Sequence, residues 1–597
     1  MDTQPTHTHG SGSDTDTDTD TDHPKSLTAP FTYGDLIVDY LKGMGVSHVF
    51  GVPGGSIEPF FDAVARAERR NIDLKMVVSR HETGAAFMVD GHIRETGRFG
   101  VCCSTTGPGA TNLITGVANA WEENLPMLVI TAQTPMTKFG KKALQDSSCS
   151  AIDIVGMFKH CTKYSTLVSH INQLEHKLIT AFMTANTPPK GPVHISLPAD
   201  IVNTQLPILP DVNTRLFEQT VSISTPSALE QLKSEIGTAE RILLFVGENC
   251  KLEENQLIQF AEQINAAIVS DPTGKRWVDE THPRYCGVFG LSGHQKARSL
   301  VMDQKYDMVL ALGAQIGELG TSSWSPALLS PKLIHIDDST TAFSRTPNAH
   351  LHICGVLSDI IGQLTTSAAI LRAQGKRWQD LTETVSEIPL LSVEEQSLTQ
   401  SNAIPLKPQR MFSSLARLLP DETRIFVDAG NSWAWAIRYM QRSDTRGYFR
   451  IAMAYGSMTW AIGASIGSAV SNSSAPHLCI TGDGSYLMAG QEITVAIQQH
   501  TPIVMMILND DALGMVKHGQ RLGGAEQTGF TLPHINYAAI GEAMGIEGIV
   551  IETPGQLEDL DFVRLFSKQS PTIIDMRIDP DEVPPMGERI KGLATAK

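Results

Sequence analysis

The sequence predicts an α/β protein made of three doubly wound domains, each with a parallel sheet. Short apolar runs alternate with stretches of helical periodicity, and glycine-rich turns follow several of the runs. Continuous apolar runs are typical of strands that are buried on both faces of a parallel sheet. At 597 residues the chain is too long for a single hydrophobic core. We therefore expect several domains, with ligands at the carboxyl ends of their strands.

The first domain is expected over residues 31–208. Its predicted strands are HVFGV, FGVCCS, PMLVITA and GPVHISL. Glycine-rich turns follow the first two, and a helix is expected to begin near Thr111 or Asn112, after Gly107-Pro108-Gly109. The prolines of LPILPDVNT, around residue 208, interrupt the pattern and mark the end of the domain.

Two further domains follow the same alternation. The central domain is expected over residues 225–368, with strands RILLFV, AAIVS, YDMVLAL and KLIHID. The third is expected over residues 408–580, with strands RIFV, HLCITG, PIVMMILN and TIIDMR. Residues 370–406 are interpreted as a helix and a polar connection, and residues 581–597 as a C-terminal tail.

The N-terminal residues 1–30 differ from the rest of the chain. They hold a Thr-Asp repeat without an apolar residue between positions 6 and 24, so they are predicted to be a disordered tail. The segment lacks the apolar core of a secretory signal and the arginines of a transit peptide.

The overall composition excludes several classes of partner. A net charge of −17 argues against nucleic acid and anionic membranes, and no apolar stretch reaches the roughly 18 residues of a membrane helix. The eight cysteines include no CxxC pair. Unpaired thiols in a reducing cytoplasm are the expectation, with small molecules as the partners.

The segment ITGDGSYLMAGQEI indicates a ligand site in the third domain. Its predicted strand ends in Gly482-Asp483-Gly484, and the next strand, PIVMMILN, ends beside Asp510. A right-handed crossover between parallel strands would place the two strand ends side by side. Two carboxylates there would form a hard oxygen site suited to Mg²⁺, completed by the oxygens of a diphosphate. Two unrelated turns with capping aspartates are the alternative.

These two motifs resemble those of the thiamine-diphosphate-dependent enzymes, whose signature is GDG followed by an Asn-Asn or Asn-Asp pair. The resemblance implies thiamine diphosphate and Mg²⁺ as cofactors. It also implies that Asp483, Asp510 and the main-chain carbonyl of Ala512 hold the metal. The second residue of the pair is often Asn in the family, so Asp510 departs from the commoner form.

The segments SRHETGAAFMVDGHIRETG and TTGPGATNLITGVANA resemble the pyrimidine-binding domain of acetolactate synthases and their relatives. The resemblance implies that Glu82 is the catalytic glutamate, which binds the aminopyrimidine ring and promotes loss of the cofactor's C2 proton. It likewise implies that Gln145 is an active-site glutamine. Further cofactor-binding positions implied by the resemblance are Gly430, Asn431, Ser432, Met458, Gly484, Ser485, Gly514 and Met515.

The chain departs from biosynthetic acetolactate synthases where those enzymes contact flavin and the second substrate. Gln315 and Leu319 stand where the family has arginines, Gly519 replaces a tryptophan, and Leu144 replaces a phenylalanine. These changes are interpreted as clustering on the acceptor side of the pocket, and they make FAD doubtful. Nearby polar residues either replace the missing anchor or form a solvated helix face; they are Lys517, His518 and Arg521.

The leading functional interpretation is decarboxylation of a 2-oxo acid, with pyruvate as the expected donor, and carboligation of the product to a second carbonyl, as in acetolactate synthase. A non-oxidative 2-oxo acid decarboxylase is the alternative, and a catalytically silent regulatory relative is a remoter one. A nicotinamide-dependent dehydrogenase would need GxGxxG after its first strand, which GVPGGS does not supply. The resemblance implies a homodimer or homotetramer.

Overall fold

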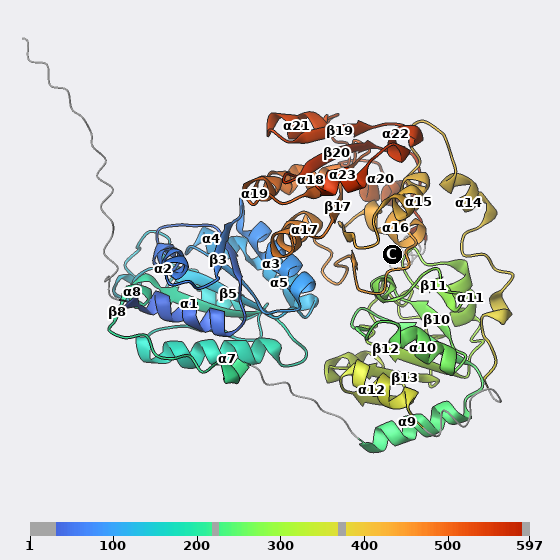
Figure 1. The fold of residues 1–597 in the computed structure, drawn as a ribbon, viewed down its shortest axis with the longest axis horizontal. Coiled ribbons are helices and arrows are strands. Elements are labelled where there is room, and N and C mark those ends of the chain that lie inside the picture. The colour runs from blue at the N-terminus through green and yellow to red at the C-terminus, as the bar shows by residue number, and fades with distance from the viewer. Residues whose placement is uncertain (1–30, 218–225, 368–377, 588–597) are drawn as a thin grey trace, which may run out of the picture.

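Three six-stranded parallel sheets form the protein, as predicted (Figure 1). The computed structural model describes residues 31–217, 226–367 and 378–587. The predicted tail at residues 1–30 lies outside these ranges, as do part of the predicted connection and the end of the C-terminal tail. Throughout the described ranges, every helix is too short or too polar to cross a membrane.

The N-terminal sheet has the strand order β3-β2-β4-β5-β7-β6. Its strands are β2 (His48–Gly51), β3 (Lys75–Val78), β4 (Gly100–Ser104), β5 (Met127–Gln133), β6 (Ser165–Leu167) and β7 (Val193–Pro198). Its helices are α1 (Tyr33–Gly43), α2 (Glu58–Arg69), α3 (Glu82–Thr96), α4 (Pro108–Asn112), α5 (Ile114–Glu122), α6 (Ile154–Phe158), α7 (Leu174–Asn186) and α8 (Ala199–Asn203). A small antiparallel pair, β1 (Phe31–Thr32) with β8 (Gln205–Leu206), joins the two ends of this domain.

The central sheet has the order β11-β10-β9-β12-β13-β14, which reverses direction between β9 and β12. Its strands are β9 (Ile242–Val246), β10 (Ala267–Ser270), β11 (Tyr285–Val288), β12 (Met308–Leu312), β13 (Leu333–Asp337) and β14 (Leu351–Cys354). The accompanying helices are α9 (Pro226–Thr238), α10 (Gln256–Gln263), α11 (Gln295–Met302) and α12 (Leu357–Thr365). Such a reversal is where open α/β sheets bind ligands.

The C-terminal sheet has the order β16-β15-β17-β18-β20-β19. Its strands are β15 (Arg424–Val427), β16 (Phe449–Arg450), β17 (His477–Gly482), β18 (Ile503–Asn509), β19 (Glu547–Ile551) and β20 (Thr572–Arg577). Helix α14 (Val393–Thr399) precedes it, and its own helices are α15 (Pro408–Leu418), α16 (Asn431–Tyr439), α17 (Trp460–Ser471), α18 (Asp483–Ala489), α19 (Ile493–Gln498), α20 (Gly514–Gly523), α21 (Tyr537–Ala543), α22 (Pro554–Glu558) and α23 (Phe562–Phe566).

The N-terminal and C-terminal domains share one hydrophobic core. Helices α3 and α17 pack against each other between the two sheets (Figure 1), and one cluster of buried side chains draws residues from both domains. Buried ion pairs also connect the central domain to the N-terminal domain. Arg94 of α3 contacts Glu123 of its own domain at 2.8 Å and Glu248 of the central domain at 3.2 Å. Such a buried network favours a fixed arrangement of the three domains, since removing one partner would leave an uncompensated charge.

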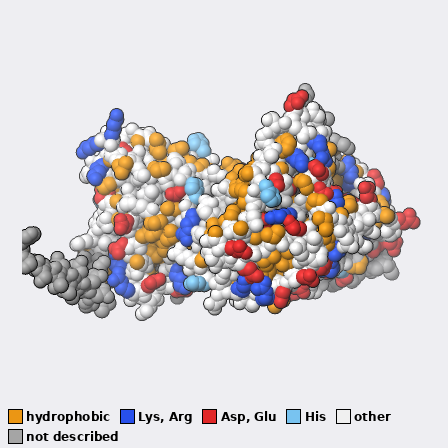
Figure 2. All heavy atoms as spheres, turned by 90° about the horizontal axis from the view of Figure 1, so that it is seen from above, with side chains coloured by type: hydrophobic (Ala, Val, Ile, Leu, Met, Phe, Trp, Pro, Cys, Tyr) orange, Lys and Arg blue, Asp and Glu red, His pale blue; other side chains and the backbone are white. Residues whose placement is uncertain are grey.

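Several large hydrophobic side chains remain at the surface of the described chain. On the face seen in Figure 2, hydrophobic side chains gather around the hollow between two raised parts of the molecule. Exposed side chains near the carboxyl edges of the N-terminal and C-terminal sheets include Leu144, Tyr455, Met458, Met488 and Val516.

Candidate active site

The ends of β17 and β18 form one wall of a cavity, as the sequence predicts. These strands pair in parallel, and Gly482 lies opposite Leu508 in their register. Asp483 follows one strand end and Asp510 the other, and both side chains line a cavity of about 460 Å³. The crossover between the strands therefore brings together two carboxylates that are separated in sequence by a helical segment.

Both carboxylates are held in surroundings that favour a bound cation. Asp483 accepts the N–H of Gly484 at 2.7 Å and that of Ala512 at 3.3 Å. Burial raises the pKa of Asp483 to about 6, against these hydrogen bonds. Burial and the negative charge of Asp483 raise the pKa of Asp510 to about 7. A cation between the two carboxylates would relieve this repulsion.

Two helices begin at the cavity and can bind an anion there. Asn431 is the first residue of α16 and Gly514 the first of α20, and both line the cavity. Free N–H groups at helix N-termini are a common binding site for phosphates. The buried Oδ1 of Asn431 has no hydrogen-bond partner within the described chain. A Cβ atom on Gly514 would lie 2.5 Å from Asn431 Nδ2 and 2.6 Å from Asp510 Oδ2, so only glycine leaves room here.

The predicted cofactor-binding residues lie around this same cavity. Its lining includes Gly430, Ser432, Met458, Gly484, Ser485 and Met515, together with the metal candidates Asp483, Asp510 and Ala512. In the described part of the chain no group of three or more His, Cys, Asp or Glu side chains is arranged to hold a metal ion. A metal ion at Asp483 and Asp510 would therefore need further oxygens from main-chain carbonyls, water or a diphosphate. The residues present fit a magnesium diphosphate.

Asp428 organises the cavity and was not identified from the sequence. It is fully buried after β15, and it accepts the N–H groups of Thr459 at 2.9 Å and Ala461 at 3.2 Å. Its carboxylate also accepts the hydroxyl of Thr481, at 2.9 Å. Met458 and Asp483 are thereby fixed relative to each other. An acid directly after a strand, in VDAG, was the available signal.

Glu82 and Gln145 lie on the N-terminal domain, outside this cavity. Glu82 is the first residue of α3, and its Oε2 accepts the side-chain amide of Asn112 at 2.9 Å. Asn112 ends the short helix α4, which begins at Pro108 rather than near Thr111 or Asn112 as predicted. Gln145 is exposed near the turn after β4, where its carbonyl accepts the Thr106 hydroxyl at 3.0 Å. In one chain, the two predicted catalytic residues and the cavity thus form separate half-sites.

The predicted cluster of acceptor-side changes is only partly present. Leu319 lines the cavity, but Gln315 lies elsewhere and its side-chain oxygen accepts a bond from Arg345 at 3.0 Å. In the single chain Gln315 instead lines a separate cavity, together with Arg345, so the two positions do not share one pocket there.

The polar residues of α20 are not among the side chains that line the cavity. Lys517 donates to the carbonyl of Pro580 at 2.8 Å and pairs with Asp581 at 3.2 Å. Arg521 donates to the Asp581 carbonyl at 3.3 Å, and His518 is buried. Lys517 and Arg521 therefore bind the segment that follows β20. Arg521 is exposed, as a solvated helix face would be, while Lys517 is not a free anchor in the single chain.

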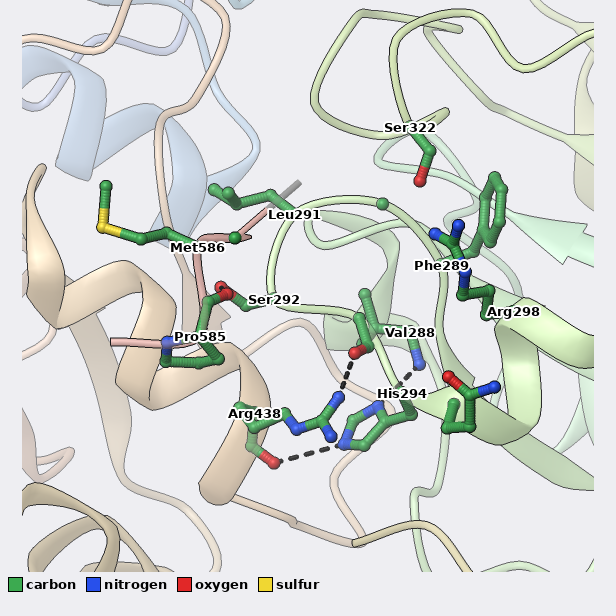
Figure 3. A pocket seen from close by; sticks show the side chains of 14 residues that line it. Val288, Phe289, Leu291, Ser292, His294, Arg298, Ser322, Arg438, Pro585 and Met586 are labelled. Atoms are coloured by element: carbon green, nitrogen blue, oxygen red, sulfur yellow. Dashed lines mark hydrogen bonds between the residues drawn. The ribbon is translucent and has the colours of Figure 1, made fainter. Parts of the chain in front are cut away.

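A smaller cavity of about 290 Å³ lies between the central domain and the C-terminal segment (Figure 3). Arg438 donates to the Gly293 carbonyl, and His294 accepts the Val288 N–H at 3.0 Å. The Ser292 hydroxyl donates to the carbonyl of Pro585 at 3.0 Å. These bonds are internal to the chain, and the cavity has no pair of carboxylates of the kind formed by Asp483 and Asp510.

Comparison with known protein families agrees with the geometry. Residues 31–154 match the N-terminal TPP binding domain of thiamine pyrophosphate enzymes, residues 229–364 their central domain, and residues 428–576 their C-terminal TPP binding domain. The chain belongs to the thiamine pyrophosphate enzymes. Within this family, whose cofactor is also called thiamine diphosphate, the N-terminal match contains Glu82 and the C-terminal match contains Asp483 and Asp510.

Individual relatives extend over almost the whole chain. A probable acetolactate synthase large subunit of Methanococcus aeolicus is 27% identical, over 92% of this chain and 93% of that protein. An acetolactate synthase of Arthrospira platensis is 29% identical, over 92% and 94%. The acetolactate synthase large subunit of Haemophilus influenzae is also 29% identical, over 92% and 94%. The similarity therefore covers all three domains of this thiamine pyrophosphate enzyme.

Proposed function

We propose that the protein decarboxylates a 2-oxo acid, with pyruvate as the expected donor, and joins the remaining fragment to a second carbonyl compound, as an acetolactate synthase does. The observation that carries the proposal is the cavity at the carboxyl ends of β17 and β18. There, two carboxylates and the starts of two helices surround a space lined by apolar side chains. This combination suits a magnesium-bound diphosphate attached to an apolar ring system.

The proposed roles in cofactor binding follow from this arrangement. Asp483, Asp510 and the carbonyl of Ala512 would hold Mg²⁺, while the N-termini of α16 and α20 would receive the diphosphate. Met458, whose position Asp428 fixes, would pack against the cofactor's rings. Bound thiamine diphosphate supplies a nucleophilic carbon and an electron sink, which allow a 2-oxo acid to lose carbon dioxide and its remaining fragment to attack a second carbonyl.

Glu82 would act on the pyrimidine ring of the cofactor. Its Oε2 is held by Asn112, which leaves Oε1 for a hydrogen bond to a ring nitrogen. Gln145, near the end of β4, would contact the substrates. Both residues lie on the N-terminal domain and not at the cavity, so a second chain would have to bring them to it.

We therefore propose a homodimer, or a homotetramer built from dimers, with each site shared by two chains. The separation of Glu82 from the cavity supports this assembly. So do the exposed apolar side chains at both half-sites, which include Leu144, Met458 and Val516. Their burial between two chains would remove apolar surface from water. All eight cysteines are free, which supports a reducing, cytoplasmic location.

FAD is a second candidate ligand, in the central domain. The reversal of strand order between β9 and β12 supports a nucleotide there, as does the buried Asp337 at the end of β13, whose Oδ2 has no hydrogen-bond partner within the described chain. The internal bond between Gln315 and Arg345 argues against a flavin held by arginine at that loop. The absorption spectrum of the protein, purified without added cofactor, tests this directly.

Product analysis tests the main proposal. The protein would be incubated with thiamine diphosphate, Mg²⁺ and pyruvate, and with a panel of 2-oxo acids and aldehydes as acceptors, and the products identified by mass spectrometry. A carboligation product is expected. Acetaldehyde as the sole product would favour a non-oxidative decarboxylase, and the absence of carbon dioxide release would favour a silent relative.

A further inference from the structure

A buried glutamate of the C-terminal domain binds the turn that carries Glu82. The turn, Arg80-His81, joins β3 to α3, and Glu82 follows it directly. The Oε2 atom of Glu492 accepts the backbone N–H of Arg80 at 3.1 Å, and its Oε1 accepts that of His81 at 2.8 Å. Both carboxylate oxygens are thus bonded to consecutive main-chain donors immediately before Glu82.

The first turn of α3 is shaped to admit this carboxylate. A Cβ atom on Gly84 would lie 2.4 Å from Glu492 Oε1 and 2.6 Å from its Cδ, so any larger residue would displace the carboxyl group. Glu492 is 1% exposed. A negative charge at the N-terminus of a helix is stabilised by the helix dipole. Gly84 of the N-terminal domain and Glu492 of the C-terminal domain are therefore closely packed against each other.

A second attachment fastens the same turn to α19. The guanidinium of Arg80 donates to the hydroxyl of Thr494 at 2.7 Å, to its carbonyl at 3.2 Å and to the Gln498 side chain at 2.9 Å. Glu492 closes the short helical turn Gly490–Glu492, which follows α18, and α18 begins at Asp483. One continuous segment therefore carries a metal-binding candidate at its start and the anchor of the Glu82 turn at its end.

Burying the Glu492 carboxylate costs desolvation free energy, which its hydrogen bonds must offset. Burial raises the pKa of Glu492 to about 7, although the N–H groups of Arg80 and His81 lower it. Nothing in the sequence pattern of α18 and α19 requires an acid there, and an apolar side chain would avoid the desolvation cost.

We propose that Glu492 is a positioning residue for Glu82: it fixes the Arg80-His81 turn so that the Glu82 carboxyl points toward the cofactor ring. The inference rests on the proposed function for the catalytic role of Glu82. Since a displacement of about 1 Å at a reacting group can cost about 100-fold in rate, loss of this anchor should act on the chemical step more than on cofactor binding.

The test compares Glu492→Ala and Glu492→Gln with a control, Gln498→Ala, which removes only a side-chain contact of Arg80. In the cofactor-free protein, hydrogen–deuterium exchange of the peptide around residues 78–86 should be faster in Glu492→Ala and intermediate in Glu492→Gln, which keeps one acceptor. In the loaded enzyme, exchange of the thiamine C2 proton should slow by about 10- to 100-fold, with the thiamine diphosphate Kd within about threefold of the wild type.

A second variant keeps the proposal falsifiable if Glu492→Ala does not fold. Gly84→Ala would press its Cβ against the carboxylate and should give the same pattern with Glu492 intact. Unchanged deuterium exchange around Glu82, or a Kd that rises as much as C2 exchange slows, would overturn the positioning role. If Glu82→Gln itself keeps normal C2 exchange, the proposed function fails instead; if only the Glu492 variants keep it, the function stands and this inference fails.

Discussion

The carboxylate of Asp428 accepts the backbone N–H of Thr459 at 2.9 Å, next to Met458 in the chain. Thr459 has a φ of 74°, a left-handed conformation that is strained for a β-branched residue. The same carboxylate accepts the hydroxyl of Thr481, two residues before Asp483. One buried side chain therefore sets Met458 and Asp483, the proposed cofactor-supporting and metal-binding residues, in a fixed relation.

Replacing Asp428 by Asn should loosen the positions of Met458 and Asp483 without abolishing cofactor binding. An amide offers one acceptor where the carboxylate offers two, and its NH₂ would face main-chain N–H groups. We expect a loss of about 1–3 kcal/mol in unfolding free energy and about tenfold weaker thiamine diphosphate binding. Denaturant unfolding and calorimetry measure the two effects. The exposed Asp421 supplies a control, Asp421→Asn, and equal cofactor affinity in both variants would contradict the prediction.

Asp483→Ala should reduce the affinity for thiamine diphosphate and Mg²⁺ by about 100-fold or more, because the diphosphate loses part of its bridging metal site. Asp510→Ala should behave alike. Asp511 is the matched control, since it neighbours Asp510 in the chain but bonds His534 at the surface, and Asp511→Ala should bind within about threefold of the wild type. Normal binding by Asp483→Ala in calorimetry would refute the metal assignment.

Glu82→Gln should keep the fold and the cofactor but lose most turnover. The amide fills the same space and still bonds Asn112, yet it cannot supply a carboxyl group to the pyrimidine ring. The loss should fall on kcat and on C2 proton exchange, both followed with the cofactor saturating. Glu58→Gln, an exposed position at the start of α2, serves as the control. Near-normal C2 exchange in Glu82→Gln would show that another group does this work.

Acceptors larger than pyruvate should compete well with it. Leu319 lines the cavity where an arginine was expected, and a charge-assisted bond to an acceptor carboxylate contributes about 1.5–3 kcal/mol. Gly519 has open space around its Cβ position. Gly519→Trp should therefore lower kcat/KM for large acceptors about tenfold more than for pyruvate.

The variant Lys517→Ala distinguishes a preference for larger acceptors from the alternative, in which Lys517 binds the carboxylate of the acceptor. Because Lys517 is bonded to Pro580 and Asp581, its removal should change the KM for a carboxylate acceptor by less than about threefold. Loss of acetolactate formation in Lys517→Ala, together with a strong preference for pyruvate as acceptor, would establish Lys517 as the anchor.

The stability of the wild type relative to Glu492→Gln should depend on pH. The pKa of Glu492 is raised to about 7 from its ordinary 4.5, mainly by burial, with Arg80 and Glu82 as the facing charges. The folded protein thus binds a proton more tightly than the unfolded chain, so this stabilisation is complete below about pH 4.5 and is lost as pH rises through 7. The difference in unfolding free energy should change by about 1.4 kcal/mol per pH unit in that window. A difference that is flat between pH 5 and 8 would contradict the assignment.

The sequence predicted the interior strands of every sheet and missed the strands at their edges. The strands β3, β6, β14 and β19 are partly exposed, so their sequences lack the continuous apolar run by which buried strands are recognised. The other two missed strands have different reasons: β16 has only two residues, and a glycine interrupts the apolar run of β11.

Short motifs likewise predicted the two aspartates of the cavity better than the contacts between distant segments around the site. Asp483 and Asp510 follow neighbouring strands, and a single crossover brings them together, so spacing along the chain was sufficient. The sequence by itself determined the three-sheet fold and most of the residues predicted to line the cavity beside Asp483, because both depend on local periodicity and on turns between adjacent strands. Only the tertiary structure decided that Glu492 binds the turn before Glu82 and that Lys517 binds Asp581. It also decided that Gln315 and Leu319 line different cavities. Those contacts depend on how distant segments pack, since burial and pairing of charges are set by neighbours in space and not by neighbours in sequence.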